Sequence, residues 1–191
     1  MTRFVLGSLA FAVAISFQGL RADETKEEAK QPEKTVVVDS LAPNLQIKDS
    51  EGKLVDLKKL TAKGPVLVRL TCGCSGCDKE LAYFQSLHKA YEGKGLTSLA
   101  IFRMPDEKVE EYVKQKKLNM LYAVDKEGKS WTTFQTKTMP TNFLIEKGGR
   151  IRSIAAGCDP NGLIANILSG KVADLLGTEK VDLKPTTPEE K

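Results

Sequence analysis

Three of the chain's four cysteines lie within six residues, and this cluster constrains the fold more than any other feature. Cys72, Cys74 and Cys77 follow the short apolar run of residues 66–68 and precede a segment with helical periodicity. A Cys-x-x-Cys pair between a buried strand and a helix places its first sulfur at the helix N-terminus, where free N–H groups and the dipole favour a thiolate. The second sulfur lies one turn later and can attack a mixed disulfide formed by the first. We therefore predict that Cys74 is the attacking thiol and Cys77 the resolving thiol of a redox-active pair.

The rest of the chain alternates between apolar strands and amphipathic helices. Such alternation predicts an α/β domain with a mixed central sheet flanked by helices, preceded here by an N-terminal β-hairpin. The predicted elements are a hairpin of residues 45–47 and 54–57, a strand from 66, a helix over 78–91, a strand over 98–102, a helix from 106, a short strand over 121–124, a weak helix around Trp131, a second hairpin of 142–145 and 151–155, and a last helix opened by Asp159 and Pro160.

The first 22 residues have the pattern of an export signal. Arg3 is followed by an uncharged run over residues 4–20, and a basic start before a short apolar stretch is typical of a secretory signal. We predict cleavage after Ala22 and an exported protein, periplasmic or otherwise extracytoplasmic. An uncleaved membrane anchor is the alternative, although the apolar run is short for a spanning helix.

The composition divides the remainder into a domain and two tails. Residues 23–35 are charged and nearly free of apolar groups, so we predict a disordered linker there, a folded α/β domain over 36–177 and a disordered tail over 178–191. Removal of residues 1–22 would lower the net charge from +4 to +2, and no basic cluster is interleaved with aromatic residues. We therefore expect no nucleic-acid partner. We also expect a monomer without a bound cofactor or metal.

Three sequence segments, in this order, carry a family resemblance. Ala42-Pro43-Asn44-Leu45 precedes the turn over 49–53, Pro65-Val66-Leu67-Val68 precedes the cysteines, and Met139-Pro140-Thr141-Asn142-Phe143-Leu144-Ile145 precedes Gly149-Arg150-Ile151. Together they resemble the thioredoxin superfamily and, within it, the exported TlpA-like, or redoxin (AhpC/TSA-like), branch. The resemblance spans roughly residues 42–168. It implies a thiol–disulfide oxidoreductase that acts on protein disulfides and receives electrons from a membrane partner.

The same resemblance assigns a substrate-binding segment. It implies that Pro140 follows a cis peptide bond beside the cysteines, so that Met139, Pro140 and Thr141 leave backbone groups free to hold a substrate peptide. Where the family usually has Trp before the first cysteine and Pro-Pro between the two, this chain has Gly73 and Ser75-Gly76. These departures leave the redox potential and the partner open.

Two charged residues near the dithiol each have two interpretations. Arg69, in the predicted buried strand, would pair with a nearby carboxylate or would lower a cysteine pKa through its charge, and we favour the pairing. Glu80 lies three residues after Cys77 and matches an acid common in the family. It would either relay protons to Cys77 or act as a first-turn acid stabilised by the helix dipole.

The fourth cysteine falls in the loop after the final predicted strand. In thioredoxin folds that loop approaches the dithiol, so we expect Cys158 on the same face as Cys74. A disulfide needs Cα atoms within about 7 Å of each other, and a bridge between Cys72 and Cys158 is a further hypothesis. The alternative for Cys158 is a small buried residue that fills apolar space.

Two other functions remain as alternatives. A peroxiredoxin would need proline at position 67, which is leucine here, before Thr71 and the cysteines. A metal-binding module would hold a soft ion with Cys72, Cys74, Cys77 and Cys158. The only histidine, His88, lies eleven residues after Cys77, or about 16 Å along a helix, which disfavours a Cys-His hydrolase.

Overall fold

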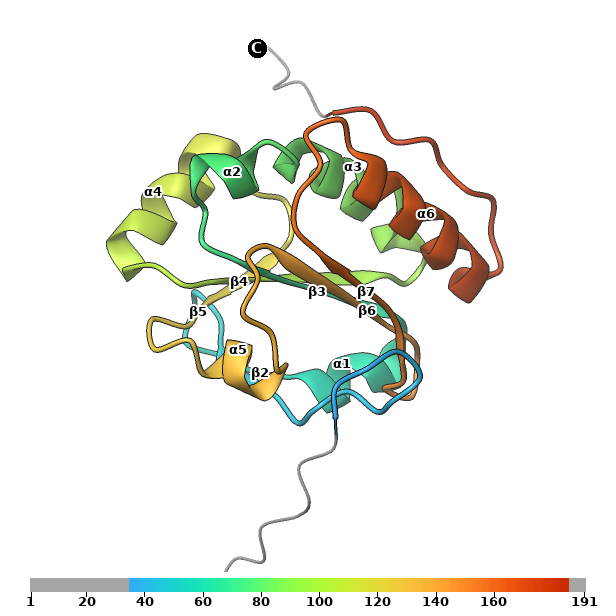
Figure 1. Cartoon of the computed structure of the whole chain (residues 1–191), viewed down its shortest axis with the longest axis horizontal. Coiled ribbons are helices and arrows are strands. Elements are labelled where there is room, and N and C mark those ends of the chain that lie inside the picture. The colour runs from blue at the N-terminus through green and yellow to red at the C-terminus, as the bar shows by residue number, and fades with distance from the viewer. Residues whose placement is uncertain (1–34, 186–191) are drawn as a thin grey trace, which may run out of the picture. The chain divides into compact units, whose positions relative to one another are not determined.

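A five-stranded mixed sheet forms the centre of the computed structural model, which describes residues 35–185 (Figure 1). The strand order is β5-β4-β3-β6-β7. The middle strand, β3, is parallel to β4 and antiparallel to β6, while β4 and β5 are parallel and β6 and β7 antiparallel. The bounds are β3 (Val66–Thr71), β4 (Thr97–Phe102), β5 (Leu121–Val124), β6 (Thr141–Ile145) and β7 (Ile151–Ala156). This architecture confirms the predicted fold class.

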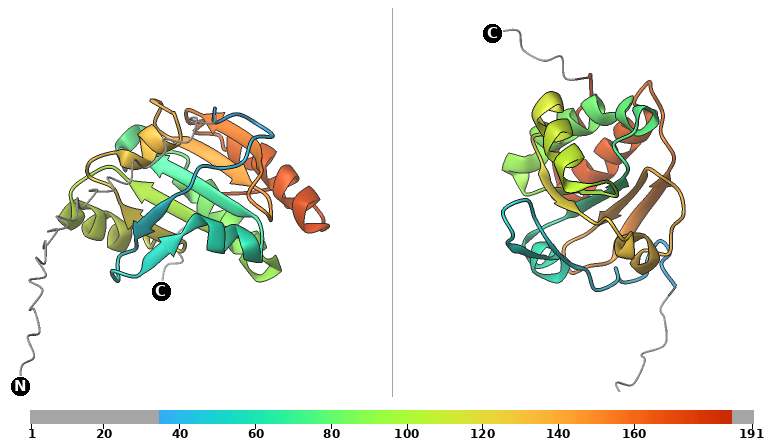
Figure 2. Two further views of the ribbon diagram at one scale, coloured as in Figure 1. Left: turned by 90° about the horizontal axis from the view of Figure 1, so that it is seen from below. Right: turned by 90° about the vertical axis from the view of Figure 1, so that its left-hand side faces the viewer.

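Helices cover both faces of this sheet, and the hairpin adds to one of them (Figures 1 and 2). Side chains alternate between the faces of a strand, and in β3 Leu67 joins one apolar cluster while Val66, Val68 and Leu70 join the other. The first face carries α2 (Ser75–Asp78), α3 (Leu81–Tyr91), η1 (Glu92–Lys94), α4 (Asp106–Lys116) and α6 (Leu163–Leu176), and the second carries α1 (Leu57–Lys63), α5 (Lys129–Thr133) and the hairpin of β1 (Gln46–Lys48) and β2 (Leu54–Asp56).

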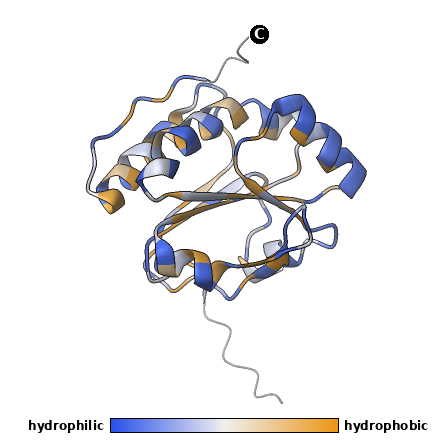
Figure 3. Cartoon of the chain, turned by 180° about the vertical axis from the view of Figure 1, so that it is seen from behind, coloured by the Kyte–Doolittle hydropathy of each residue, from blue (hydrophilic) through white to orange (hydrophobic). Residues whose placement is uncertain are grey.

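Hydropathy follows this layering. The strands of the central sheet are predominantly hydrophobic, whereas α4 is largely hydrophilic (Figure 3). Every residue of β3 is buried, as expected for a strand with neighbours on both sides and helices on both faces. Trp131 is buried in the cluster on the α1 and α5 face.

Three helices of the structure differ from those predicted. Residues 57–63 form a helix that was not predicted, because the Asp56 carboxylate accepts hydrogen bonds from the N–H groups of Lys58 and Lys59 and caps it. The helix expected over 78–91 is divided into α2 and α3 at Lys79 and Glu80. The last helix begins at Leu163 instead of Asp159, whose carboxylate caps the preceding turn.

The C-terminal segment differs most from expectation. The predicted signal and linker lie outside the described residues, except Thr35, but residues 178–185 of the predicted disordered tail pack against α3 and α6. The N–H of Val181 donates to the Tyr91 hydroxyl at 2.8 Å, the Ser169 hydroxyl donates to the Val181 carbonyl at 2.6 Å, and Leu183 is buried. The ordered domain therefore extends beyond residue 177. None of the helices in residues 35–185 is long and apolar enough to cross a membrane.

We predict that Tyr91→Phe releases this segment. The hydroxyl of Tyr91 is buried and contacts both Ser169 and the Val181 N–H, so its removal takes one contact from Ser169 and leaves the Val181 N–H without its partner. The free energy of unfolding should fall by about 1–3 kcal/mol, and hydrogen exchange at the Val181 amide should accelerate. Tyr122→Phe, at a half-buried tyrosine elsewhere on the sheet, is the control. Equal effects of the two changes would contradict the prediction.

Candidate functional site

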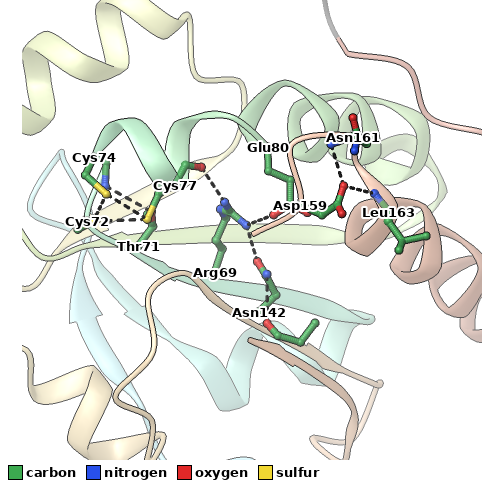
Figure 4. A network of polar contacts seen from close by, with 12 residues as sticks. Arg69, Thr71, Cys72, Cys74, Cys77, Glu80, Asn142, Asp159, Asn161 and Leu163 are labelled. Atoms are coloured by element: carbon green, nitrogen blue, oxygen red, sulfur yellow. Dashed lines mark hydrogen bonds and ion pairs between the residues drawn. The ribbon is translucent and has the colours of Figure 1, made fainter. Parts of the chain in front are cut away.

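Three thiols meet where β3 ends and α2 begins (Figure 4). The sulfur atoms of Cys72 and Cys74 are 2.9 Å apart, those of Cys72 and Cys77 3.4 Å, and those of Cys74 and Cys77 3.6 Å. All three cysteines are free thiols, with Cys74 exposed, Cys72 half-buried and Cys77 buried. The structure thus presents one thiol to solvent and holds the other two beside it.

Their surroundings make the three thiols unequal as acids. Cys74 is the N-cap of α2. A hydrogen bond from the Cys72 thiol, with further contacts from the N–H groups of Cys77 and Gly76, lowers the pKa of Cys74 to about 7. Burial and the contact with Cys74 raise the pKa of Cys72 to about 12. Near neutral pH, the site therefore favours one thiolate, on the exposed sulfur.

A buried ion pair lies directly beneath the thiols. The Arg69 guanidinium is 3.5 Å from the Glu80 carboxylate, donates to the Asn142 side-chain oxygen at 2.8 Å and donates to the Cys77 carbonyl at 3.1 Å. It also lies 4.2 Å from the centre of the Phe84 ring. Burial lowers the pKa of Arg69 and raises that of Glu80, while the attraction between the two charges opposes both shifts. The predicted pairing of Arg69 with a carboxylate is confirmed.

Glu80 is oriented by this pair and by the loop that follows β7. Its side chain is fully buried, and the backbone N–H of Asp159 faces its carboxylate. Figure 4 shows Glu80 between Arg69 and Asp159. Neither of the two interpretations of Glu80 from the sequence, a proton relay or a first-turn acid, included this arrangement. The link from Glu80 to the dithiol runs through Arg69, which holds the carbonyl of Cys77.

Asn142 is the site residue that the sequence analysis missed. It lies opposite Arg69 in the β3–β6 register and is fully buried. A signal was available, because Asn142 is an amide side chain in a strand whose next three residues are apolar. A buried amide needs hydrogen-bond partners, and here they are Arg69 and the carbonyl of Ala155.

The strand register places the proline segment beside the cysteines. The Met139-Pro140 peptide bond is cis, as the resemblance implied. Thr141 pairs with Leu70, so Pro140 lies next to Thr71, one residue before Cys72. The Pro140 carbonyl accepts a hydrogen bond from the N–H of Gly157 at 2.8 Å, and the Thr141 hydroxyl donates to the Thr138 carbonyl.

Cys158 lies outside the three-thiol cluster. The end of β7 is at the same edge of the sheet as the end of β3, which agrees with the expected approach of its loop. Strand β6 separates the two ends, however, and two interstrand steps amount to about 10 Å. Cys72 and Cys158 are both free thiols, so the hypothesis of a bridge between them is not borne out. Cys158 is also exposed, so it does not fill buried apolar space.

The lone histidine has a structural environment. His88 is buried on α3, and its Nε2 lies 3.1 Å from the Glu92 carboxylate, one turn further along. Burial lowers the pKa of His88, although the contact with Glu92 opposes the shift. The described partner of His88 is therefore a carboxylate of its own helical segment and not one of the thiols.

Comparison with known proteins now places the chain in a family. The AhpC/TSA family model matches residues 38–154. The chain belongs to the AhpC/TSA family. The thiol-disulfide oxidoreductase ResA of Bacillus cereus (strain ZK / E33L) is 33% identical over 146 residues, which cover 76% of this chain and 78% of the relative. ResA of Bacillus subtilis (strain 168) is 25% identical over 130 residues, covering 67% of this chain and 72% of the relative.

Solved structures agree on the fold of this redoxin. The thioredoxin domain of a thiol-disulfide oxidoreductase from Bacteroides vulgatus superposes with a TM-score of 0.63 at 22% identity, covering 72% of this chain and 99% of that domain. Together, the matches confirm the resemblance to thioredoxin-superfamily redoxins. They also confirm the prediction of a thiol–disulfide oxidoreductase.

The contact between Cys72 and Cys74 predicts a measurable pH dependence. The ultraviolet absorbance of the first thiolate should rise with a midpoint near pH 7, and Cys72→Ala should move that midpoint upward by about one pH unit because the thiol donor is lost. The pKa of Cys74 in the folded protein lies below the ordinary thiol pKa of 9.0. Ionisation of Cys74 therefore stabilises the fold fully above pH 9.0, and this contribution is lost as the pH falls through 7.

Two further variants control this experiment. Cys72→Ser keeps a hydroxyl donor and should give an intermediate midpoint, whereas Cys158→Ser should leave the midpoint unchanged. An unchanged midpoint in Cys72→Ala would show that the contact does not stabilise the thiolate.

The ion pair beneath the thiols predicts a large loss of stability when one partner is removed. Glu80→Gln leaves the Arg69 charge buried without its counter-ion, so urea unfolding should show a loss of about 3–5 kcal/mol. Combining Glu80→Gln with Arg69→Met should cost less than the sum of the two single changes. Glu127→Gln, which removes an exposed pair with Lys129, should cost less than about 1 kcal/mol. Strict additivity at the buried pair would refute the coupling.

Proposed function

We propose that this redoxin reduces or exchanges protein disulfides through Cys74 and Cys77. The observation that carries the proposal is the asymmetry of the pair. An exposed sulfur at a helix N-terminus lies 3.6 Å from a buried one. A protein disulfide can reach the first sulfur, while the second is within reach of any mixed disulfide formed there.

The exchange has two balanced steps. The Cys74 thiolate attacks one sulfur of the substrate disulfide, forms a mixed disulfide and releases the other substrate sulfur as a thiolate. The Cys77 thiol loses its proton and attacks the Cys74 sulfur, which releases the second substrate sulfur and leaves a Cys74–Cys77 disulfide. Two electrons pass to the substrate, and the released thiolates take up protons. Exchange in the opposite direction follows the same steps reversed.

The segment of Met139, Pro140 and Thr141 would hold the substrate peptide next to Cys74. Register with β3 supports this role, because Pro140 lies beside Thr71. Proline has no N–H, so this segment cannot pair as a regular strand edge. A substrate peptide beside it would bind the backbone groups that remain free. The Thr141 hydroxyl already contacts Thr136 and Thr138, so its side chain supports the segment internally.

The proposal includes export and an external source of electrons. The basic and apolar start of the chain supports secretion with cleavage after Ala22. Outside the cytoplasm, a Cys74–Cys77 disulfide would be reduced again by a membrane partner that supplies two electrons. Glu80 would act on the dithiol by holding Arg69 against the Cys77 carbonyl, and the Cys77 proton would pass to a released substrate thiolate. We expect the protein to act as a monomer.

Disulfide reduction tests the assignment. The protein lacking residues 1–22 should reduce the disulfides of insulin when dithiothreitol is supplied, and Cys74→Ser should lower the rate to that of dithiothreitol alone because the attacking sulfur is gone. Cys158→Ser should retain the rate. Full activity in a protein with both Cys74→Ser and Cys77→Ser would refute the proposal.

A trapping experiment assigns the two roles. Cys77→Ser removes the resolving sulfur, so a mixed disulfide with a substrate peptide should accumulate on Cys74 and be found by peptide mapping. A trapped partner on Cys72 would overturn the order of attack. A matched Cys74→Ser protein should trap nothing.

A further inference from the structure

The proposed dithiol exchange needs two sulfurs, yet the site contains three in mutual contact. The sulfur of Cys72 is nearer to each of the other two than they are to one another, at 2.9 and 3.4 Å against 3.6 Å. Within residues 35–185, these three side chains form the one group of at least three potential metal ligands whose donor atoms lie close together. We propose that the reduced site also binds one Cu(I) ion through the sulfurs of Cys72, Cys74 and Cys77.

The sulfur triangle has nearly the size that a metal requires. Metal–thiolate bonds of about 2.3 Å place three sulfurs about 4.0 Å apart around a trigonal ion and about 3.8 Å apart in a tetrahedral site. The observed separations are 2.9–3.6 Å. Each sulfur pair must therefore widen by roughly 1 Å or less. Cys74 is exposed and Cys72 half-buried in the loop between β3 and α2, so rotation of these two side chains provides that movement.

The donor set favours a soft monovalent ion. All three donors are sulfur, and thiolates select Cu(I) or Zn(II) over harder cations. A tetrahedral zinc site needs a fourth ligand, but the Asp78 carboxylate of α2 is held by Tyr112 and Lys116, and His88 contacts Glu92. Three thiolates without a fourth protein ligand match the low coordination number of Cu(I).

Gly73 makes the close approach of the first two sulfurs compatible with the surrounding chain. It joins Cys72 to Cys74 with a φ of +62°, a conformation that glycine adopts without strain. A Cβ atom at this position would lie 2.9 Å from the Met104 sulfur. The Met104 thioether therefore packs directly against Gly73, and the neighbour of the loop at this point is a soft, uncharged side chain.

Binding of copper and formation of the disulfide exclude each other. Each ligand must lose its proton when it binds the ion, so loading the site releases protons from the thiols. A Cys74–Cys77 disulfide removes two of the three ligands. Cu(I) would consequently bind the reduced protein alone and would block exchange while bound.

Copper titration of the full chain under anaerobic conditions tests the proposal. Reduced protein should withdraw one equivalent of Cu(I) from a chromogenic Cu(I) chelator, and the oxidised protein none. X-ray absorption at the copper edge should find three sulfur neighbours at about 2.3 Å. Cys72→Ser and Cys72→Ala should each weaken Cu(I) binding by at least about 100-fold. Loss of a residue that hydrogen-bonds to a metal ligand typically costs about 10–100-fold, and loss of the ligand itself should cost no less. Cys158→Ser should change it less than about 2-fold, because Cys158 is outside the cluster.

Several outcomes would overturn the three-thiol copper site. If both Cys72 variants bind Cu(I) with unchanged affinity, and X-ray absorption finds two sulfur neighbours, the ion is bound by Cys74 and Cys77 alone. Weaker Cu(I) binding by Cys158→Ser would show that Cys158 is a ligand. Tighter binding of Zn(II) than of Cu(I) would show that the site does not select Cu(I). Circular dichroism of each Cys72 variant shows whether it is folded, and insulin reduction reports on the dithiol independently of copper.

Discussion

A positive charge buried in the central strand is the constraint on which the site depends. An arginine inside a sheet is costly unless its charge and its donors are matched. Arg69 meets this requirement with a carboxylate from the start of α3, an amide from β6 and the carbonyl of Cys77. Asn142 comes from a strand distant in sequence, whereas Cys77 and Glu80 follow Arg69 on the next segment of the chain. Satisfying one side chain therefore fixes the position of the helix that carries the dithiol relative to the sheet.

The same constraint accounts for the break between α2 and α3. A continuous helix was expected over 78–91, but the chain turns at Lys79 and Glu80. That turn lets the Glu80 side chain point inward to Arg69 and leaves α2 as a single turn capped by Cys74. Asp78 then ties this short helix to Tyr112 and Lys116 of α4. The exposed position of Cys74 and the burial of Cys77 follow from a helical turn that is anchored on two sides.

The order of most elements and the dithiol could be predicted from the sequence, whereas features that depend on pairing across the sheet could not. Hydrophobic periodicity gave the order of strands and helices, and the spacing of Cys74 and Cys77 gave the dithiol. Asn142 was missed because its role exists only in register with Arg69. Residues 178–185 were predicted disordered on composition, yet Tyr91 and Ser169 supply partners for their backbone. The distance between Cys72 and Cys158 likewise depends on β6 lying between their strands.

A third thiol changes what the dithiol can do, because three adjacent sulfurs cannot all carry charge in the absence of a cation. Cys72 keeps its proton and donates it toward Cys74, so the reduced site carries its charge on the one sulfur that solvent reaches. That state suits nucleophilic attack on a disulfide. A soft cation would reverse the balance, since it stabilises all three thiolates at once and occupies the attacking sulfur. The same three residues therefore support two mutually exclusive states, a free Cys74 thiolate and a metal-bound set of three thiolates. Cys72 acts in both, as a hydrogen-bond donor to Cys74 in the first and as a ligand in the second.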